Sequence, residues 1–156
     1  MGNPAQTSAR RILWLSFAAA GLLGPAVWGL LQLLSPQDEP TDFMNVRLGM
    51  TAAQVRAHIV RPGRFSTETD PSGLLVLTWT PADPTDSVRE ARFEIHDGMV
   101  VAIRAQLRGS RPAALTVAPE AVRRTAPRPG GGSEFVLLAR GCPLHEEEVE
   151  DLLRAP

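Results

Sequence analysis

From Ile12 to Leu34 the chain runs for twenty-three residues without a charged side chain. A helix needs about 20 mostly apolar residues to cross the hydrocarbon core of a bilayer, so this run is long enough to span one. Arg10 and Arg11 precede the run and acidic residues follow it, which is typical of a segment whose amino end stays in the cytoplasm. We therefore predict a transmembrane signal anchor at 12–34 that spans a lipid bilayer, with 1–11 cytoplasmic and the remaining chain extracytoplasmic.

A cleaved secretory signal is the alternative interpretation of the same run. The apolar region of such a signal is usually about 7 to 15 residues long and ends at small residues, a role that Ala18, Ala19 and Ala20 can fill. Cleavage there would leave only Ile12–Phe17 as the apolar region, although the chain stays apolar long afterwards. The length favours the uncleaved anchor, and both interpretations export the domain that follows.

Composition limits what the exported part can be. Residues 35–42 are rich in Pro, Asp and Glu, as expected of a solvated tether. About 115 residues remain after the tether, which is near the commonest size of a single domain. The formal net charge of the chain is only −1, so nucleic acid is not indicated as a partner.

Local signals predict a short helix followed by strands. Thr51 and Gln54 have the spacing of a capping box, in which each side chain accepts a hydrogen bond from the backbone of the other residue. This spacing predicts a helix over Thr51–Val60. Alternating apolar side chains then predict a strand at Gly73–Thr80 and a shorter one at Arg64–Thr69.

The segment Val88–Arg108 is expected to form a β-hairpin, and the facing of its apolar side chains favours one type of loop. A two-residue turn at Asp97–Gly98 would place the apolar residues of the two strands on different faces. A three-residue loop of His96, Asp97 and Gly98 beside a bulge would pair Phe93 with Val101 and keep them on one face. We therefore predict the bulged three-residue loop.

The C-terminal part of the chain carries weaker signals. Leu115–Val117 is expected to be a strand, Glu120–Thr125 either a strand or a turn of helix, and Glu134–Arg140 a strand with a continuous apolar run. The glycine-rich segment 127–133 joins them as a flexible loop. A last helix is expected to begin at Pro143, which suits the first helical position, and to bury Val149, Leu152 and Leu153.

These elements predict an α+β fold, in which an N-terminal transmembrane helix precedes a small domain of short helices packed on an antiparallel sheet. We place the helix-and-sheet domain at 43–110 and treat 111–156 as a C-terminal extension, a strand plus the terminal helix, packed on the same domain. Cys142 is the only cysteine, so no internal disulfide can stabilise this domain and its stability must come from packing.

The segment Phe43–Val55, which ends in Gly-Met-Thr-Ala-Ala-Gln-Val, resembles the opening of the BamE (SmpA/OmlA) family of bacterial envelope proteins. Phe93–Val100 is similar to the last hairpin of the sheet in that family, so the resemblance covers residues 43–107. It implies helical elements followed by a small antiparallel sheet, and a binding or assembly role in the envelope. Members of the family are usually tethered by a lipidated cysteine, a role that the apolar run would take over in this chain. The resemblance therefore implies a bacterial inner membrane for the anchor and a periplasmic location for the domain.

Cys142 and His145 are the one pair that suggests chemistry. The dipole at a helix N-terminus can activate a cysteine, and a histidine three residues later lies on the same side of the helix. The pair would suit a thiol enzyme or a redox sensor, but no third residue that would orient the histidine is visible, and a buried structural cysteine is the simpler interpretation. We expect no cofactor and no metal site, because zinc would also require His58 and His96 to arrive from other elements.

We therefore predict a non-catalytic binding or assembly domain that contacts another envelope protein or a cell-wall component. A thiol enzyme or redox sensor, or a ligand-binding or inhibitor module on the same fold, are the alternatives. One candidate contact surface is the more solvated face of the hairpin, and the other is the acidic run of the last helix. The first consists of Arg92, Glu94, Arg104 and Gln106, and the second of Glu146, Glu147, Glu148, Glu150 and Asp151.

Overall fold

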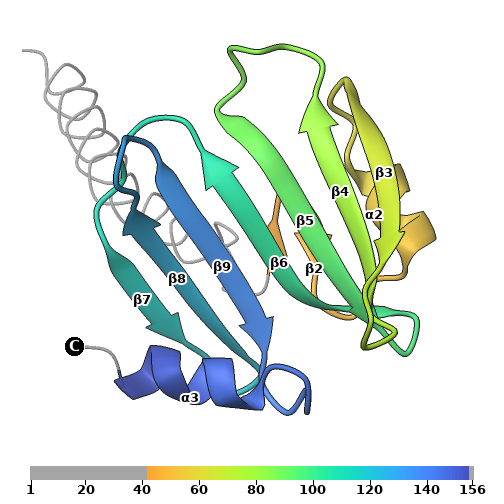
Figure 1. Ribbon diagram of the computed structural model, residues 1–156, viewed down its shortest axis with the longest axis vertical. Helices are drawn as coiled ribbons and strands as arrows, with labels where there is room; N and C mark the ends of the chain where they lie inside the picture. Colours follow the sequence, from red (N-terminus) through yellow and green to blue (C-terminus); the bar gives the residue numbers. More distant parts are fainter. Residues whose placement is uncertain (1–41, 155–156) are drawn as a thin grey trace, which may run out of the picture. The chain divides into compact units, whose positions relative to one another are not determined.

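The computed structural model describes residues 42–154, and its main element is one antiparallel β-sheet (Figure 1). The sheet has seven strands in the order β3-β4-β5-β6-β9-β8-β7. A two-stranded sheet, β1 and β2, and two helices, α2 and α3, accompany it. The bounds are β1 Asp42–Phe43, β2 Val46–Arg47, α2 Ala52–His58, β3 Gly63–Thr69, β4 Leu75–Pro81, β5 Val88–His96, β6 Met99–Leu107, β7 Ala114–Val117, β8 Ala121–Pro127, β9 Ser133–Ala139 and α3 Glu146–Arg154.

The structure contradicts the predicted α+β fold class. The described residues form a mainly β fold, in which two helices of 7 and 9 residues accompany the seven-stranded sheet. Neither helix is long and apolar enough to cross a membrane, which takes about 20 residues. The predicted transmembrane helix and signal anchor are therefore not seen, and residues 12–34, to which they were assigned, lie outside the described part of the chain.

The C-terminal segment accounts for most of the additional β-structure. β7, β8 and β9 are consecutive antiparallel strands of the main sheet, and β9 pairs with β6. The main sheet therefore contains strands from both sides of the boundary that was predicted between residues 110 and 111. β8 carries a weak sequence signal because only its first two residues, Ala121 and Val122, are buried.

The predicted capping box is confirmed at the start of α2. The Thr51 hydroxyl accepts a hydrogen bond from the Gln54 N–H at 3.4 Å, and the Gln54 side-chain oxygen accepts one from the Thr51 N–H at 2.8 Å. These two bonds satisfy backbone donors that the first turn of a helix leaves unpaired. Val55 and Ile59 are buried and fix α2 against the sheet.

The turn of the β5–β6 hairpin differs from the prediction. Asp97 and Gly98 form a two-residue turn with φ of 51° and 79°, so the predicted three-residue loop is wrong. A register shift beside Glu94 then adds one residue to β6, and Phe93 lies opposite Ile103. The extra residue keeps the apolar side chains of both strands on one face, but the bulge lies within the strands rather than at the turn.

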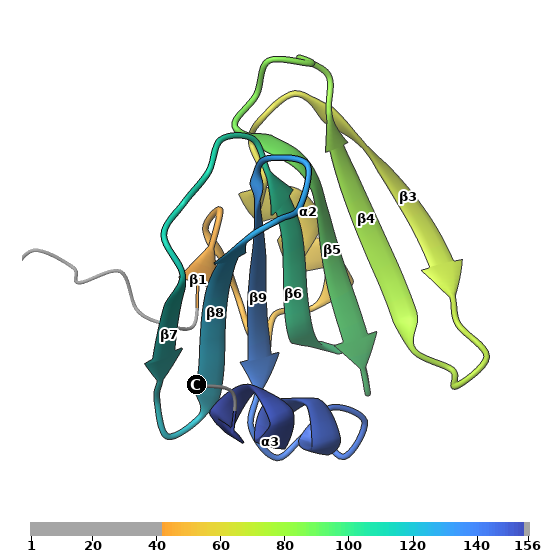
Figure 2. The ribbon, with the colours of Figure 1, turned by 60° about the vertical axis from the view of Figure 1, so that its left-hand side comes forward.

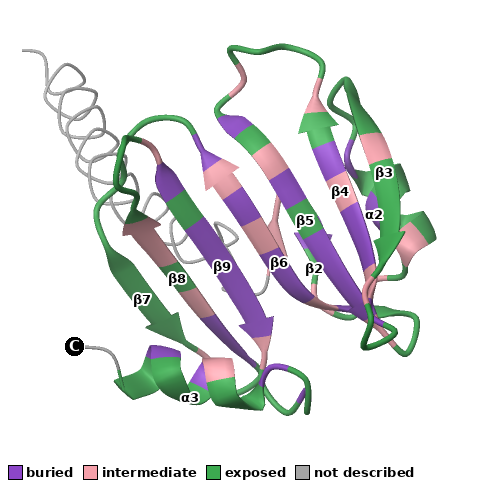
Figure 3. Ribbon diagram, viewed as in Figure 1, coloured by how far each residue is buried: buried purple, intermediate pink, exposed green. Residues whose placement is uncertain are grey.

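Other elements pack on both faces of the sheet, but they cover the two faces unequally. On one face, α2 and the β1–β2 pair cover the larger core, whose fully buried side chains include Leu77, Trp79 and Phe93. On the opposite face, Val149 and Leu152 of α3 pack on a smaller apolar cluster. Buried residues accordingly concentrate on β4, β5, β6 and β9 (Figure 3). Because α3 crosses only one end of this second face (Figure 2), much of the face is left open.

The terminal helix begins later than predicted. Pro143 lies in a turn, in which the His145 N–H donates to the Cys142 carbonyl at 3.0 Å, and α3 starts only at Glu146. Leu153, which was expected in the buried stripe, is 41% exposed. The turn places His145 directly before the first helical residue.

Candidate functional site

Four charged side chains meet where α3 approaches β5 and β6. We call Glu94, Arg104, His145 and Glu148 the charged cluster. Arg104 donates from Nε to Glu94 at 2.7 Å, and from Nη1 and Nη2 to the two oxygens of Glu148 at 2.7 and 2.5 Å. Nε2 of His145 lies 2.7 Å from the second oxygen of Glu94. The cluster thereby connects both strands of the hairpin to α3.

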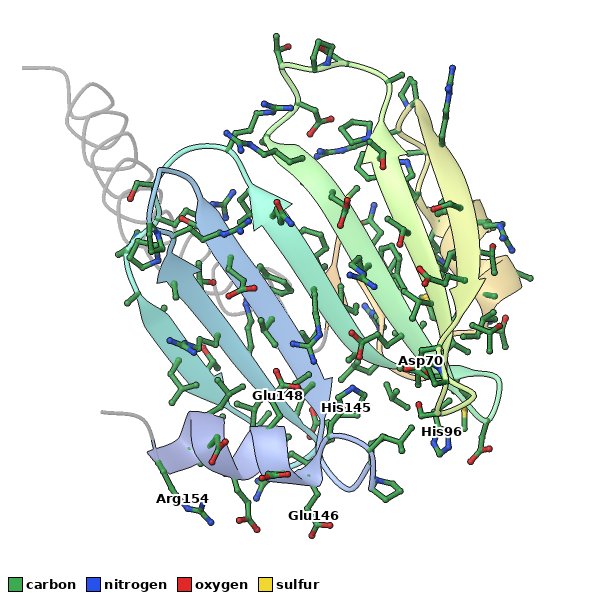
Figure 4. The ribbon with its side chains drawn as sticks, in the orientation of Figure 1. Asp70, His96, His145, Glu146, Glu148 and Arg154 are labelled. Carbon is green, nitrogen blue, oxygen red and sulfur yellow. The ribbon has the colours of Figure 1, made fainter. Side chains whose placement is uncertain are left out.

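The local geometry of three elements brings these side chains together. Glu94 and Arg104 share the face of the hairpin opposite to the buried Phe93, because side chains alternate along a strand. His145 and Glu148 are three residues apart and therefore lie on the same side of the helix. Figure 4 shows these two on the side of α3 that faces the sheet, with Glu146 on the outward side.

Pairing outweighs burial in the electrostatics of the cluster. Burial alone would raise the pKa of Glu94, but the hydrogen bond from His145 and the charge of Arg104 hold this pKa below its ordinary value of 4.5. The hydrogen bonds to Glu148 and the charge of Glu94 raise the pKa of Arg104. Both groups are therefore charged at neutral pH, and each compensates for the desolvation of the other.

His145 completes the charge balance of the cluster. The hydrogen bond to Glu94 raises the pKa of His145, burial opposes this effect, and the Cys142 thiol adds to it. Protonated His145 and Arg104 balance the two carboxylates, so the cluster is neutral when the ring is charged and carries a net negative charge when it is not. The other ring nitrogen, Nδ1, is buried and has no hydrogen-bond partner among the described residues.

These shifts predict how stability depends on pH. Because the pKa of folded His145 is raised, its contribution is fully present below the ordinary value of 6.5 and is lost as pH rises through the folded-state pKa. Because the pKa of folded Glu94 is lowered, its contribution is present above 4.5 and is lost as pH falls through the folded-state pKa. We expect the stabilisation from the cluster to be greatest between pH 4.5 and 6.5.

Urea unfolding at a series of pH values tests this expectation. In the wild type, the free energy of unfolding should fall on the alkaline side of 6.5 because His145 loses its proton there. His145→Gln should remove most of that decrease. His58→Gln, which changes an exposed histidine on α2, should preserve it. An equal alkaline decrease in both variants would show that His145 is not its source.

A groove of about 410 Å³ lies beside the charged cluster. The buried Leu74 and Val76 and the exposed Leu144 contribute its apolar lining. Arg92 lies opposite Arg104 in the β5–β6 pairing and lines both this groove and a second hollow of about 120 Å³. The Arg92 side chain is exposed and makes no ion pair or hydrogen bond within the described part of the chain.

The residues of the predicted hairpin surface have different environments in the structure. Glu94 is only 9% exposed and Arg104 is half-buried, and both belong to the charged cluster. Arg92 is exposed, and Gln106 is half-buried in the lining of the second hollow. The solvated face expected for all four therefore holds for Arg92 but not for Glu94.

The acidic run of α3 also divides into separate roles. Glu148 belongs to the charged cluster, whereas Glu150 and Asp151 pair with Arg154 on the exposed side of the helix. Glu146 and Glu147 are exposed. The run is therefore mainly a solvated helix face with one residue turned inward.

The other two histidines lie on different elements. On α2, Nδ1 of His58 lies 2.9 Å from the Gln54 carbonyl, and His96 lies at the end of β5 beside Asp97. Within residues 42–154, no group of three or more His, Cys, Asp or Glu side chains is arranged to hold a metal ion. A zinc site built from Cys142, His145 and these two histidines therefore has no support in the described residues.

Comparison with known proteins identifies no relative. No protein-family model matches the chain, and neither a curated protein nor a solved structure is significantly similar to it. The resemblance to the BamE family stays a prediction, and a functional proposal must rest on the geometry of the groove and the charged cluster.

Proposed function

We propose that this domain is a non-catalytic binding module that holds a protein partner in the groove beside the charged cluster. The observation that carries the proposal is the environment of Arg92. Its guanidinium is exposed and has no partner within residues 42–154, whereas all three nitrogens of the neighbouring Arg104 guanidinium are bound. An unpaired arginine in a groove is suited to a bidentate contact with a carboxylate of a partner.

The surroundings of Arg92 favour a protein over a small molecule. Small-molecule sites are usually concave and mostly apolar, and they enclose most of the ligand. This groove is open, and charged side chains make up much of its lining. Leu144 is 45% exposed in the wall of the groove and offers an apolar contact in the same groove as Arg92, a combination found in protein interfaces.

The wider setting stays a prediction. An extracytoplasmic location and a role in the envelope were inferred from the sequence, and a cell-wall component is the alternative partner to a protein. A partner protein that fits the groove would present an acidic side chain to Arg92 and an apolar side chain to Leu144.

A photo-crosslinking amino acid at Ser72, in the wall of the groove, tests the proposal in cells that express the full chain. We expect one defined adduct with another protein, and we expect Arg92→Glu to reduce its yield by about tenfold, because charge reversal repels the carboxylate. Arg89→Glu is the matched control, since Arg89 is an exposed arginine of the same strand outside the groove lining. Equal loss in both variants, or no adduct at all, would contradict a binding site at Arg92.

A further inference from the structure

The charged cluster leaves one polar atom unused, and that atom is close to the only cysteine. The His145 side chain is 6% exposed, its Nε2 is bound to Glu94, and its Nδ1 has no partner in the described part of the chain. Cys142 and His145 belong to one tight turn, in which the His145 N–H donates to the Cys142 carbonyl at 3.0 Å, and the thiol contributes to the raised pKa of the ring. No hydrogen bond of regular geometry joins the thiol to Nδ1. Glu94 holds Nε2 of His145 in place, and Nδ1 stays available to the Cys142 thiol.

We propose that Cys142, His145 and Glu94 form a thiol site that reacts with hydrogen peroxide. Glu94 is the orienting residue for the histidine, which the sequence alone did not reveal. Above its folded-state pKa His145 is neutral, and the Glu94 carboxylate holds the remaining proton on Nε2. The lone pair of the ring is then on Nδ1, where it can take the proton of the thiol. Glu94 also stabilises the imidazolium that this transfer produces, and a thiolate is the nucleophilic form of cysteine.

The reaction is a two-electron oxidation of the sulfur. The Cys142 thiol transfers its proton to Nδ1 of His145, and the thiolate attacks one oxygen of hydrogen peroxide. The S–O bond forms as the O–O bond breaks, and the departing hydroxide takes the proton from His145 and leaves as water. Cys142 becomes a sulfenic acid, and the peroxide is reduced to water.

Burial and composition limit the reagent and the product. Cys142 is 6% exposed, so a reagent of the size of hydrogen peroxide suits the site better than a bulky electrophile. The chain has no second cysteine, so the sulfenic acid cannot form a disulfide within one molecule. Each protein molecule can therefore form one sulfenic acid, which an external thiol compound could reduce back to the thiol.

The test compares the same thiol in the folded chain and in the urea-unfolded chain. Each sample is exposed to hydrogen peroxide for timed intervals, treated with catalase, and then fully unfolded with a maleimide that labels the remaining thiol. Intact-mass spectra count the labelled fraction and the fraction that gained one oxygen atom. We expect the folded chain to react about tenfold faster than the unfolded chain, because only the folded chain has His145 beside the thiol.

Two variants identify the source of the effect. Glu94→Gln should lower the folded-state rate to near the unfolded-state rate, whereas Glu90→Gln, a carboxylate on the same face of β5 with no contact to His145, should leave the rate unchanged. If the folded chain reacts no faster than the unfolded chain, or if both variants react like the wild type, the proposal is wrong. If Glu94→Gln does not fold, the comparison of the folded and unfolded wild type still tests whether the folded site activates the thiol.

Discussion

Replacing Arg104 by alanine is expected to lower the free energy of unfolding by about 3 kcal/mol. The substitution removes three hydrogen bonds, leaves Glu148 without its cation in the cluster and leaves Glu94 with His145 as its remaining partner there. The side chain of Glu94 is 12% exposed, so water can replace little of the lost interaction there, whereas the more exposed Glu148 recovers part of its hydration. Urea unfolding at pH 6, followed by circular dichroism, measures the difference.

Arg92→Ala is the matched control for this prediction. Arg92 is the residue paired with Arg104 across the hairpin, and it makes no ion pair within residues 42–154. Its removal should change the free energy of unfolding by no more than about 0.5 kcal/mol. If the two substitutions have the same effect, the charged cluster does not stabilise the attachment of α3 to the hairpin.

Replacing Gly132 by alanine is expected to cost about 3 kcal/mol of stability, from two sources. Gly132 has a φ of 83°, which a residue with a side chain adopts only with strain. A Cβ atom there would also lie less than 3.0 Å from the carbonyl oxygen of Leu107 at the end of β6. Because the opposing atom belongs to the backbone, it cannot move away as a flexible side chain would. Urea unfolding of the variant checks the predicted loss.

Gly131→Ala separates the two sources of this cost. Gly131 has a φ of 96°, but a Cβ atom there would meet nothing within 4 Å. This variant should therefore lose only the conformational part, about 1 kcal/mol. Equal losses at the two positions would mean that the loop between β8 and β9 can shift away from Leu107.

The glycine-rich loop shows how far a local pattern can mislead. Its composition indicates a flexible connection, and a connection between strands is what the structure contains. The next residue, Ser133, is fully buried, and its hydroxyl accepts a hydrogen bond from the Arg111 N–H at 2.6 Å. Gly132 itself lies close to the backbone of Leu107, and composition cannot distinguish such a contact from flexibility.

The extra residue predicted for the β5–β6 hairpin is present, but it lies at another position than expected. The alternation of apolar side chains requires one extra residue between the two strands. The Asp97–Gly98 pair favours a two-residue turn, because both residues adopt positive φ readily. The chain satisfies both requirements by forming the tight turn and placing the bulge beside Glu94.

The sequence by itself determined the features that depend on neighbours within a few residues. The capping box of α2 and most of the strands follow from side-chain chemistry and alternation, which act over short stretches of chain. These local signals do not determine how many strands join one sheet, because strand pairing is a long-range contact. For that reason the fold was assigned to the wrong class, even though several of its elements were recognised.

Only the tertiary structure decided what the charged residues do. The sequence predicts Glu94 on the surface of the hairpin, but its partner His145 lies 51 positions later in the chain. Arg104 and its partner Glu148 are 44 positions apart. No local pattern connects such residues, because their proximity depends on the strand order and on where α3 packs. The same packing that buries Glu94 leaves Arg92 exposed, which is why two charged residues on the same face of β5 have different environments.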